Sequence, residues 1–115
     1  MRAVLFALVI LTPGAAFADG GADAFNTNCG ACHGLDATST PLAPGLKGIA
    51  GRKIASLTDF DYSDVLKAKG GTWTDQALDA FLTDPSTFAP GTKMFGGAPD
   101  PVQRKAIIDY LKTVK

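Results

Sequence analysis

Cys29, Cys32 and His33 stand within five consecutive residues, C-G-A-C-H, and this motif constrains the fold more than any other feature of the chain. On a helical backbone, residues three and four apart share a face, so all three side chains are expected on one side. The spacing is typical of c-type haem attachment, in which two thiols bond the porphyrin edge and the histidine ligates the iron. The chain is therefore expected to fold around one large, flat, covalently bound cofactor.

Three other interpretations of the motif fit less well. A thioredoxin-like redox site expects a βαβ context, and no strand-rich pattern surrounds residues 20–35. A zinc site needs four ligands, yet the chain contains two cysteines and one histidine in total. A structural disulfide remains open in an oxidising compartment, although it would leave the adjacent histidine unexplained.

The N-terminus predicts export. Met1 and Arg2 are followed by an unbroken apolar run over residues 3–11, and Ala16-Phe17-Ala18 is an A-x-A cleavage signal. A retained membrane anchor would need about 20 apolar residues, and Thr12-Pro13-Gly14 interrupts this run early. We therefore predict a secretory signal peptide over residues 1–18, removed after Ala18, a mature domain over 19–115, and a periplasmic location.

The predicted mature chain is one small domain of nearly neutral charge. It has 97 residues, with 10 basic and 11 acidic side chains. Because no basic excess is present, nucleic-acid binding is not expected. We also expect the protein to be a monomer. A domain of this size buries only about 60–65% of its unfolded-chain surface. We therefore expect the haem-free chain to be largely unstructured.

The periodicity and capping signals predict an all-α domain with about four to five helices. A first helix is expected over 19–33 with Asp19 as its cap, a short one over 63–69, a third from Thr74 until Pro85 stops it, and a last one capped by Asp100. Residues 34–58 are rich in Gly, Pro, Ser and Thr and predict a long loop around the porphyrin edge. The buried stripe of the last helix is expected at Ala106, Ile107, Tyr110, Leu111 and Val114.

Met94 is the only methionine besides the initiator, and it lies in a loop rich in glycine and proline over residues 89–99. Most methionines fill gaps in a core. Once a haem is accepted, however, the second axial position of the iron needs a ligand, and the chain has no second histidine. A thioether opposite His33 is therefore the better interpretation.

Several motifs in a fixed order identify a resemblance that covers residues 19–115. C-G-A-C-H is followed by P-G-L-K-G-I-A-G-R (44–52), F-D-Y (60–62), G-G-T-W (70–73), F-L-T-D-P (81–85), P-G-T-K-M (90–94) and I-I-D-Y-L-K (107–112). The chain resembles a class I c-type cytochrome of the mitochondrial cytochrome c and bacterial cytochrome c2 group. The resemblance implies the small all-α cytochrome c fold around one haem c, bonded through Cys29 and Cys32, with His33 and Met94 on the iron.

The resemblance also implies roles for four further residues. The Pro44 carbonyl would accept a hydrogen bond from the other ring nitrogen of His33 and so fix the imidazole. Tyr62 and Trp73 would hydrogen-bond a haem propionate, and Arg52 would offset its charge. In addition, Gly21 and Phe25 of the first helix would pack against Tyr110 of the last.

The function implied by the resemblance is one-electron transfer, with no side chain acting as acid, base or nucleophile and hence no enzymatic activity. The partners would be a redox donor and acceptor, such as a membrane cytochrome complex, an oxidase, a reaction centre or a dehydrogenase. Two alternatives remain open: a dedicated cytochrome subunit of a periplasmic oxidoreductase complex, and a haem enzyme or sensor with a labile methionine ligand.

Two departures from the family pattern concern the surroundings of the predicted haem. Phe81 stands where close relatives usually carry a tyrosine that hydrogen-bonds the methionine sulfur, and Leu66 where they often carry an asparagine. We therefore expect that this chain lacks the internal hydrogen-bond network that the tyrosine and the asparagine form in those relatives. Family members that serve acidic partners surround the exposed haem edge with lysines. In this chain Lys93 is kept, but Asn28 stands before Cys29 where a lysine is common. We expect weak electrostatic steering and a shallow dependence of electron transfer on ionic strength.

Overall fold

The computed structural model describes residues 16–115, and the predicted leader's apolar run, residues 3–11, lies outside this part. The described part contains five helices and no strand, apart from an isolated bridge between Lys53 and Thr72. The helices are α1 (Ala16–Asn28), α2 (Asp64–Lys69), α3 (Asp75–Thr83), α4 (Pro85–Phe88) and α5 (Pro101–Leu111). None of the helices in this range is long and apolar enough to cross a membrane. The all-α prediction is confirmed.

The ends of α1 differ from the prediction. The helix begins at Ala16, so Asp19 lies inside it and does not cap it, and it ends at Asn28, so the C-G-A-C-H motif falls in a turn and not in the helix. The turn stays helix-like because the backbone N–H groups of Cys32 and His33 both donate to the Cys29 carbonyl, at 3.1 and 3.0 Å. The motif therefore keeps its three side chains together although the regular helix has ended.

Capping signals placed α2, α3 and α5 well. The side chains of Thr74 and Asp100 accept hydrogen bonds from backbone N–H groups of the first turns, as predicted. Ser63, expected as the first residue of its helix, caps α2 in the same way. Gly70, directly after α2, has a φ of 69°, a conformation that favours glycine. Helix α4 was not predicted: Pro85 ends α3 as expected, but it also occupies the first position of a new helix capped by Asp84.

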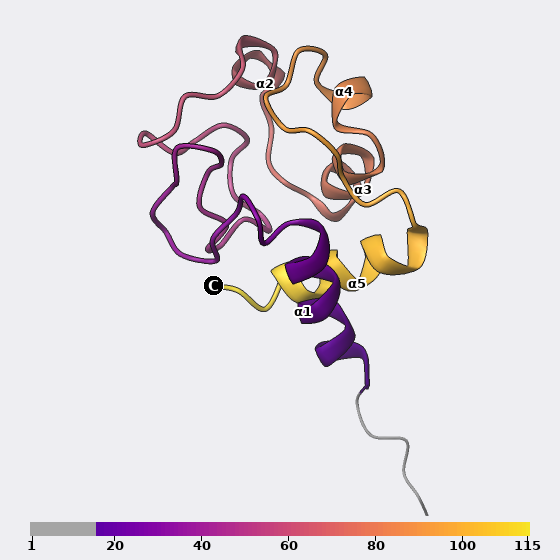
Figure 1. Ribbon diagram of the computed structural model, residues 1–115. Coiled ribbons are helices and arrows are strands. Elements are labelled where there is room, and N and C mark those ends of the chain that lie inside the picture. Colours follow the sequence, from indigo (N-terminus) through magenta and orange to yellow (C-terminus); the bar gives the residue numbers. More distant parts are fainter. Residues whose placement is uncertain (1–15) are drawn as a thin grey trace, which may run out of the picture.

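Helices α1 and α5 cross and form the base of the molecule (Figure 1). Their close approach depends on Gly21, where an added Cβ would lie 2.7 Å from the Ala106 carbonyl oxygen. Beside this contact the rings of Phe25 and Tyr110 lie 5.9 Å apart. The predicted packing of Gly21 and Phe25 against Tyr110 is thus confirmed.

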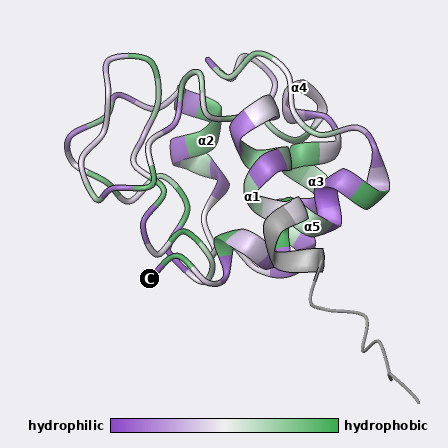
Figure 2. Cartoon of the chain, turned by 60° about the horizontal axis from the view of Figure 1, so that its bottom comes forward, coloured by the Kyte–Doolittle hydropathy of each residue, from purple (hydrophilic) through white to green (hydrophobic). Residues whose placement is uncertain are grey.

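The buried stripe of α5 is only partly the predicted one. Ile107 and Leu111 are buried as expected, but Ala106, Tyr110 and Val114 are only partly buried, and Ile108 is buried although it was not predicted. The reason is that α5 packs against both α1 and α3, so its buried face is wider than one contact would require. Along the helices hydrophilic and hydrophobic residues alternate, as expected for helices with one buried side (Figure 2).

The long segment between α1 and α2 forms one side of the molecule, and α3 with α4 forms the other (Figure 1). Backbone hydrogen bonds fold this segment onto the rest of the chain: Gly51 N–H donates to the Trp73 carbonyl at 2.9 Å, and Trp73 N–H to the Arg52 carbonyl at 2.8 Å. The two sides enclose a cavity between them.

Candidate cofactor site

A cavity of about 270 Å³ lies at the centre of the fold, and residues from almost every element line it. All of the residues predicted to bind the cofactor are among them, although they come from positions far apart in the sequence. These residues are Cys29, Cys32, His33, Pro44, Arg52, Tyr62, Trp73 and Met94. The fold thus brings the whole predicted set to one place.

The His33 side chain is fixed by the loop that follows it. Its Nδ1 lies 3.1 Å from the Pro44 carbonyl oxygen, and because a carbonyl only accepts, Nδ1 must carry the proton in this bond. The lone pair is then on Nε2. Burial lowers the pKa of His33, and the bond to Pro44 opposes this only in part. A neutral imidazole with a free Nε2 is the form that ligates a metal.

The two cysteine thiols are free and line the same cavity. Cys29 is buried, and this burial raises the pKa of its thiol to about 11, whereas Cys32 is exposed. Cys32 therefore marks the edge at which the cavity opens to solvent. No three His, Cys, Asp or Glu side chains of residues 16–115 gather into a metal-binding cluster, so the zinc interpretation gains no support.

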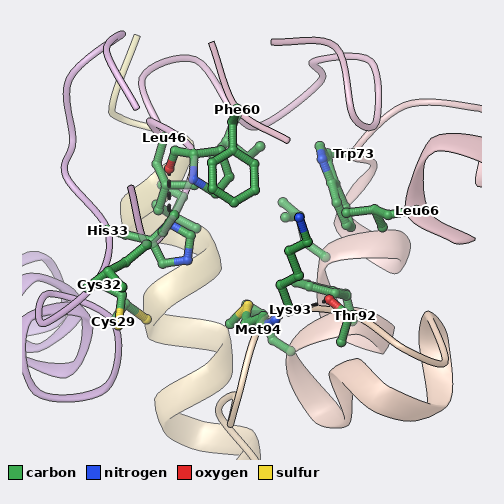
Figure 3. Close-up of a pocket in the computed structure, with 18 of the residues that line it drawn as sticks. Cys29, Cys32, His33, Leu46, Phe60, Leu66, Trp73, Thr92, Lys93 and Met94 are labelled. Carbon is green, nitrogen blue, oxygen red and sulfur yellow. Dashed lines mark hydrogen bonds between the residues drawn. The ribbon is translucent and has the colours of Figure 1, made fainter. Parts of the chain in front are cut away.

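Met94 enters the cavity from the loop between α4 and α5. In Figure 3 its side chain and the His33 imidazole project into the same space from different parts of the chain. The only hydrogen bond that Met94 makes within the described residues is from its backbone N–H to Thr92 Oγ1, at 3.3 Å. The thioether is thus available as a ligand, and the position of its loop must be set by other residues.

Three polar side chains reach the cavity with unused donors. The Nη1 and Nη2 groups of Arg52 donate to the carbonyls of Lys47 and Gly45, but its buried Nε has no partner. The Tyr62 hydroxyl accepts from Leu57 N–H at 3.4 Å, which leaves its own proton free to donate. Burial lowers the pKa of Arg52 and raises the pKa of Tyr62. The Trp73 indole N–H, part of the same wall, makes no hydrogen bond within residues 16–115.

The remaining wall is apolar. Phe81 is buried, with its ring 5.1 Å from that of Trp73 and 5.6 Å from that of Phe88, and Leu66 is buried beside them. Neither Phe81 nor Leu66 carries a polar group, so this part of the wall offers no hydrogen-bond donor to the cavity.

The residues present fit a haem c. Two thiols at the attachment spacing, a neutral imidazole and a thioether would hold the ring and the iron, and apolar side chains would cover the ring faces. The unpartnered Arg52 Nε is costly when it is buried alone, and an ionised propionate would satisfy it. The fold and the site together define a small helical domain whose central cavity fits a haem.

The comparisons with known proteins agree with this class. The chain matches the cytochrome c family model over residues 18–115 and belongs to that family. It is 42% identical over 90 residues to cytochrome c2 iso-2 of Magnetospirillum molischianum, covering 77% of this chain and 93% of the relative. It is 45% identical over 98 residues to cytochrome c of Tetrahymena pyriformis, covering 84% and 88%.

A solved structure gives the same result for the fold. Cytochrome cH from Methylobacterium extorquens superposes with a TM-score of 0.76 at 41% identity, covering 84% of this chain and 97% of that chain. The predicted cytochrome c fold is therefore confirmed. The chain belongs to a family of electron-transfer proteins that carry haem c and act with redox partners.

Two groups outside the predicted set hold the Met94 loop. Lys93 Nζ donates to the Asp61 carbonyl at 2.8 Å and to its carboxylate at 3.0 Å. Arg104 Nη1 donates to the carbonyls of Ala98 and Pro99 at 3.1 and 3.0 Å, while its Nε binds Asp79 at 2.7 Å. The sequence analysis missed both because the acidic partners, Asp61 and Asp79, lie 32 and 25 positions away, a separation that no local pattern reveals.

Proposed function

We propose that this chain is a periplasmic one-electron carrier whose haem, attached through Cys29 and Cys32, is ligated by His33 and Met94. The observation that carries the proposal is the hydrogen bond from His33 Nδ1 to Pro44, because it turns a free imidazole lone pair toward the cavity that Met94 also lines. Both axial positions would then be filled by the chain itself, which favours electron transfer over substrate binding.

The chain's own residues account for the conditions that electron transfer needs. Bound haem c supplies a centre that takes up and releases one electron. The Pro44 bond keeps the His33 ring in one orientation, and the apolar wall with Phe81 and Leu66 keeps water away. Because the ligands are held in place, little rearrangement would accompany a change of oxidation state.

The other predicted residues have supporting roles in this proposal. Arg52, Tyr62 and Trp73 would bind a propionate with the donors that are unused in the structure. No side chain would act as acid, base or nucleophile. The protein would work as a monomer between a redox donor and a redox acceptor.

The absorption spectrum of the purified protein tests the haem and both ligands together. We expect the visible bands of a covalent c-type haem, retained after denaturation, and the weak long-wavelength band that a methionine sulfur gives to ferric iron near neutral pH. Loss of the haem on denaturation would contradict covalent attachment. Absence of the long-wavelength band, with rapid binding of a small exogenous ligand, would favour the enzyme or sensor alternative.

Location and assembly need separate experiments. The mass of the protein purified from the periplasmic fraction should correspond to a chain that begins at Asp19 and carries one haem. Recovery in the cytoplasmic fraction, or with residues 1–18 still present, would contradict export and cleavage. Constant copurification with one large oxidoreductase would favour the subunit alternative over a free carrier.

A further inference from the structure

The cavity opens to solvent through a small set of exposed side chains, which we call the mouth. They are the residues that line the cavity and are at the same time exposed: Asn28, Ala31, Cys32, Leu42, Lys93 and Phe95. They come from the end of α1, the turn that follows it, the long loop and the Met94 loop. The mouth is the point of the surface closest to the predicted haem edge, because Cys32 belongs to it.

Two large apolar side chains stand out in the mouth. Phe95, directly after Met94, is 97% exposed, and Leu42 is 69% exposed. Single exposed apolar residues are common on protein surfaces. Here two of them, one an almost fully exposed phenylalanine, lie on the rim of the cavity that fits the cofactor.

The mouth has almost no free charge. Lys93 is its only charged residue, and it is paired with the Asp61 carboxylate at 3.0 Å. Asp61 also lies 3.3 Å from Lys67, which is 3.9 Å from Asp64, so two lysines and two aspartates balance one another. The Asn28 amide is bonded as well, to the Ala24 carbonyl and to the Gln103 side chain.

We propose that the mouth docks the redox partner through an uncharged, apolar face on that partner, with Phe95 and Leu42 as the contact residues. This inference rests on the proposed function and deepens it. An acidic partner would find no unpaired cation in the mouth, whereas an apolar face would bury both side chains. Transient redox complexes use small interfaces. Contact at the mouth brings the partner to Cys32 and hence to the predicted haem edge.

Gold electrodes coated with alkanethiol monolayers provide the probe, with a methyl-terminated film in place of an apolar partner and a carboxylate-terminated film in place of an acidic one. We expect the holoprotein to exchange electrons rapidly on the methyl film, with less than about a twofold change when the salt concentration is raised, because few charges are involved. Phe95→Asp and Leu42→Asp should each slow exchange there by about tenfold, the usual cost of losing a central contact.

Val102→Asp is the matched control, because Val102 is 79% exposed and apolar but does not line the cavity. It should exchange electrons on the methyl film at the wild-type rate. Phe95 is next to Met94, so Phe95→Asp could slow exchange by displacing the ligand. Leu42→Asp tests the same surface from a different loop, and the methionine band of each variant shows whether the ligand is retained.

Two results would overturn the proposal. One is rapid exchange only on the carboxylate film with a steep salt dependence, which would indicate an acidic partner. The other is a dimer that forms at high concentration and is lost in Phe95→Asp, which would assign the mouth to a second copy of the chain. If a small soluble mediator also fails to oxidise and reduce the protein, it is the proposed function that fails.

Discussion

The two sides of the cavity hold their ligands in different ways. On the His33 side the imidazole is bonded directly to Pro44, in a loop that makes its own contacts, such as Leu46 N–H to the Gly34 carbonyl at 3.1 Å. On the Met94 side no hydrogen bond to the sulfur is present within residues 16–115. The loop is held instead by Lys93, by Arg104 and by the bond from Ala98 N–H to the Leu82 carbonyl at 2.7 Å. The position of His33 is thus set locally, and that of Met94 from a distance.

The difference suggests a division of roles. The His33 side, with the two attachment cysteines, would give the domain its permanent core. The Met94 side would set the ligand strength and the potential, and could change without loss of the fold. Substitutions on the two sides should therefore differ in kind as well as in size.

The largest difference is expected between removal of the two ligands. His33→Ala should prevent accumulation of folded holoprotein, because the haem contributes most of the core of a domain this small. Met94→Ala should still yield folded protein with covalent haem, destabilised by about 2–5 kcal/mol and without the methionine band. Haem staining and circular dichroism of the purified variants would measure this. Equal loss of holoprotein in both would contradict the division.

A backbone contact tests the local character of the His33 side. At Gly45 an added Cβ would lie 2.5 Å from the Asp36 carbonyl oxygen, so Gly45→Ala should cost about 1–3 kcal/mol through overpacking. Gly34→Ala is the control, because its nearest neighbour would be 3.9 Å away. Thermal unfolding followed by the haem absorption should separate the two. Equal unfolding midpoints for Gly45→Ala and Gly34→Ala would show that the loop moves to accept the added methyl group, which would contradict a rigid His33 side.

The distant anchor of the Met94 loop is tested by Arg104→Met. It removes the bonds to Ala98, Pro99 and Asp79 from a side chain that is only 13% exposed, at an expected cost of about 1.5–3 kcal/mol. On heating, the methionine band should disappear before the helices unfold. Lys105→Met, which breaks an exposed pair with Asp109, should cost at most about 0.5 kcal/mol and leave the band unchanged. Simultaneous loss of band and helices in Arg104→Met would argue against a specific anchor.

The smallest effect is expected from a donor added on the Met94 side. Phe81→Tyr introduces a hydroxyl group into the apolar wall that lines the cavity. A hydrogen bond to the sulfur would favour ferrous iron and the added polarity ferric iron, so the two effects oppose each other. A bond of about 0.5–1.5 kcal/mol limits the shift in potential to about 20–60 mV. If voltammetry and the methionine band were both unchanged, Phe81 would have no tuning role.

Much of this architecture could be predicted because its signals are local. The C-G-A-C-H motif and the caps at Ser63, Thr74 and Asp100 each act within a few residues. The Asp84-Pro85 pair is the same capping signal as Asp100-Pro101, so α4 could also have been predicted from the sequence.

Long-range contacts explain what could not be predicted. The Gln103 side chain accepts a hydrogen bond from Asn28, 75 positions away, which no local pattern predicts. The Lys93 and Arg104 anchors and the burial of Ile108 likewise depend on partners that only the folded chain brings near.

The proton NMR signal of the Met94 methyl group tests the central claim most directly. If residues 1–18 are removed, Met94 is the only methionine left, so protein labelled with methyl-¹³C methionine should give a single methyl resonance. In the reduced protein we predict this resonance far upfield of the usual methionine position, because a ligating thioether lies directly over the porphyrin ring. A single resonance at the usual methionine position would contradict His33 and Met94 ligation.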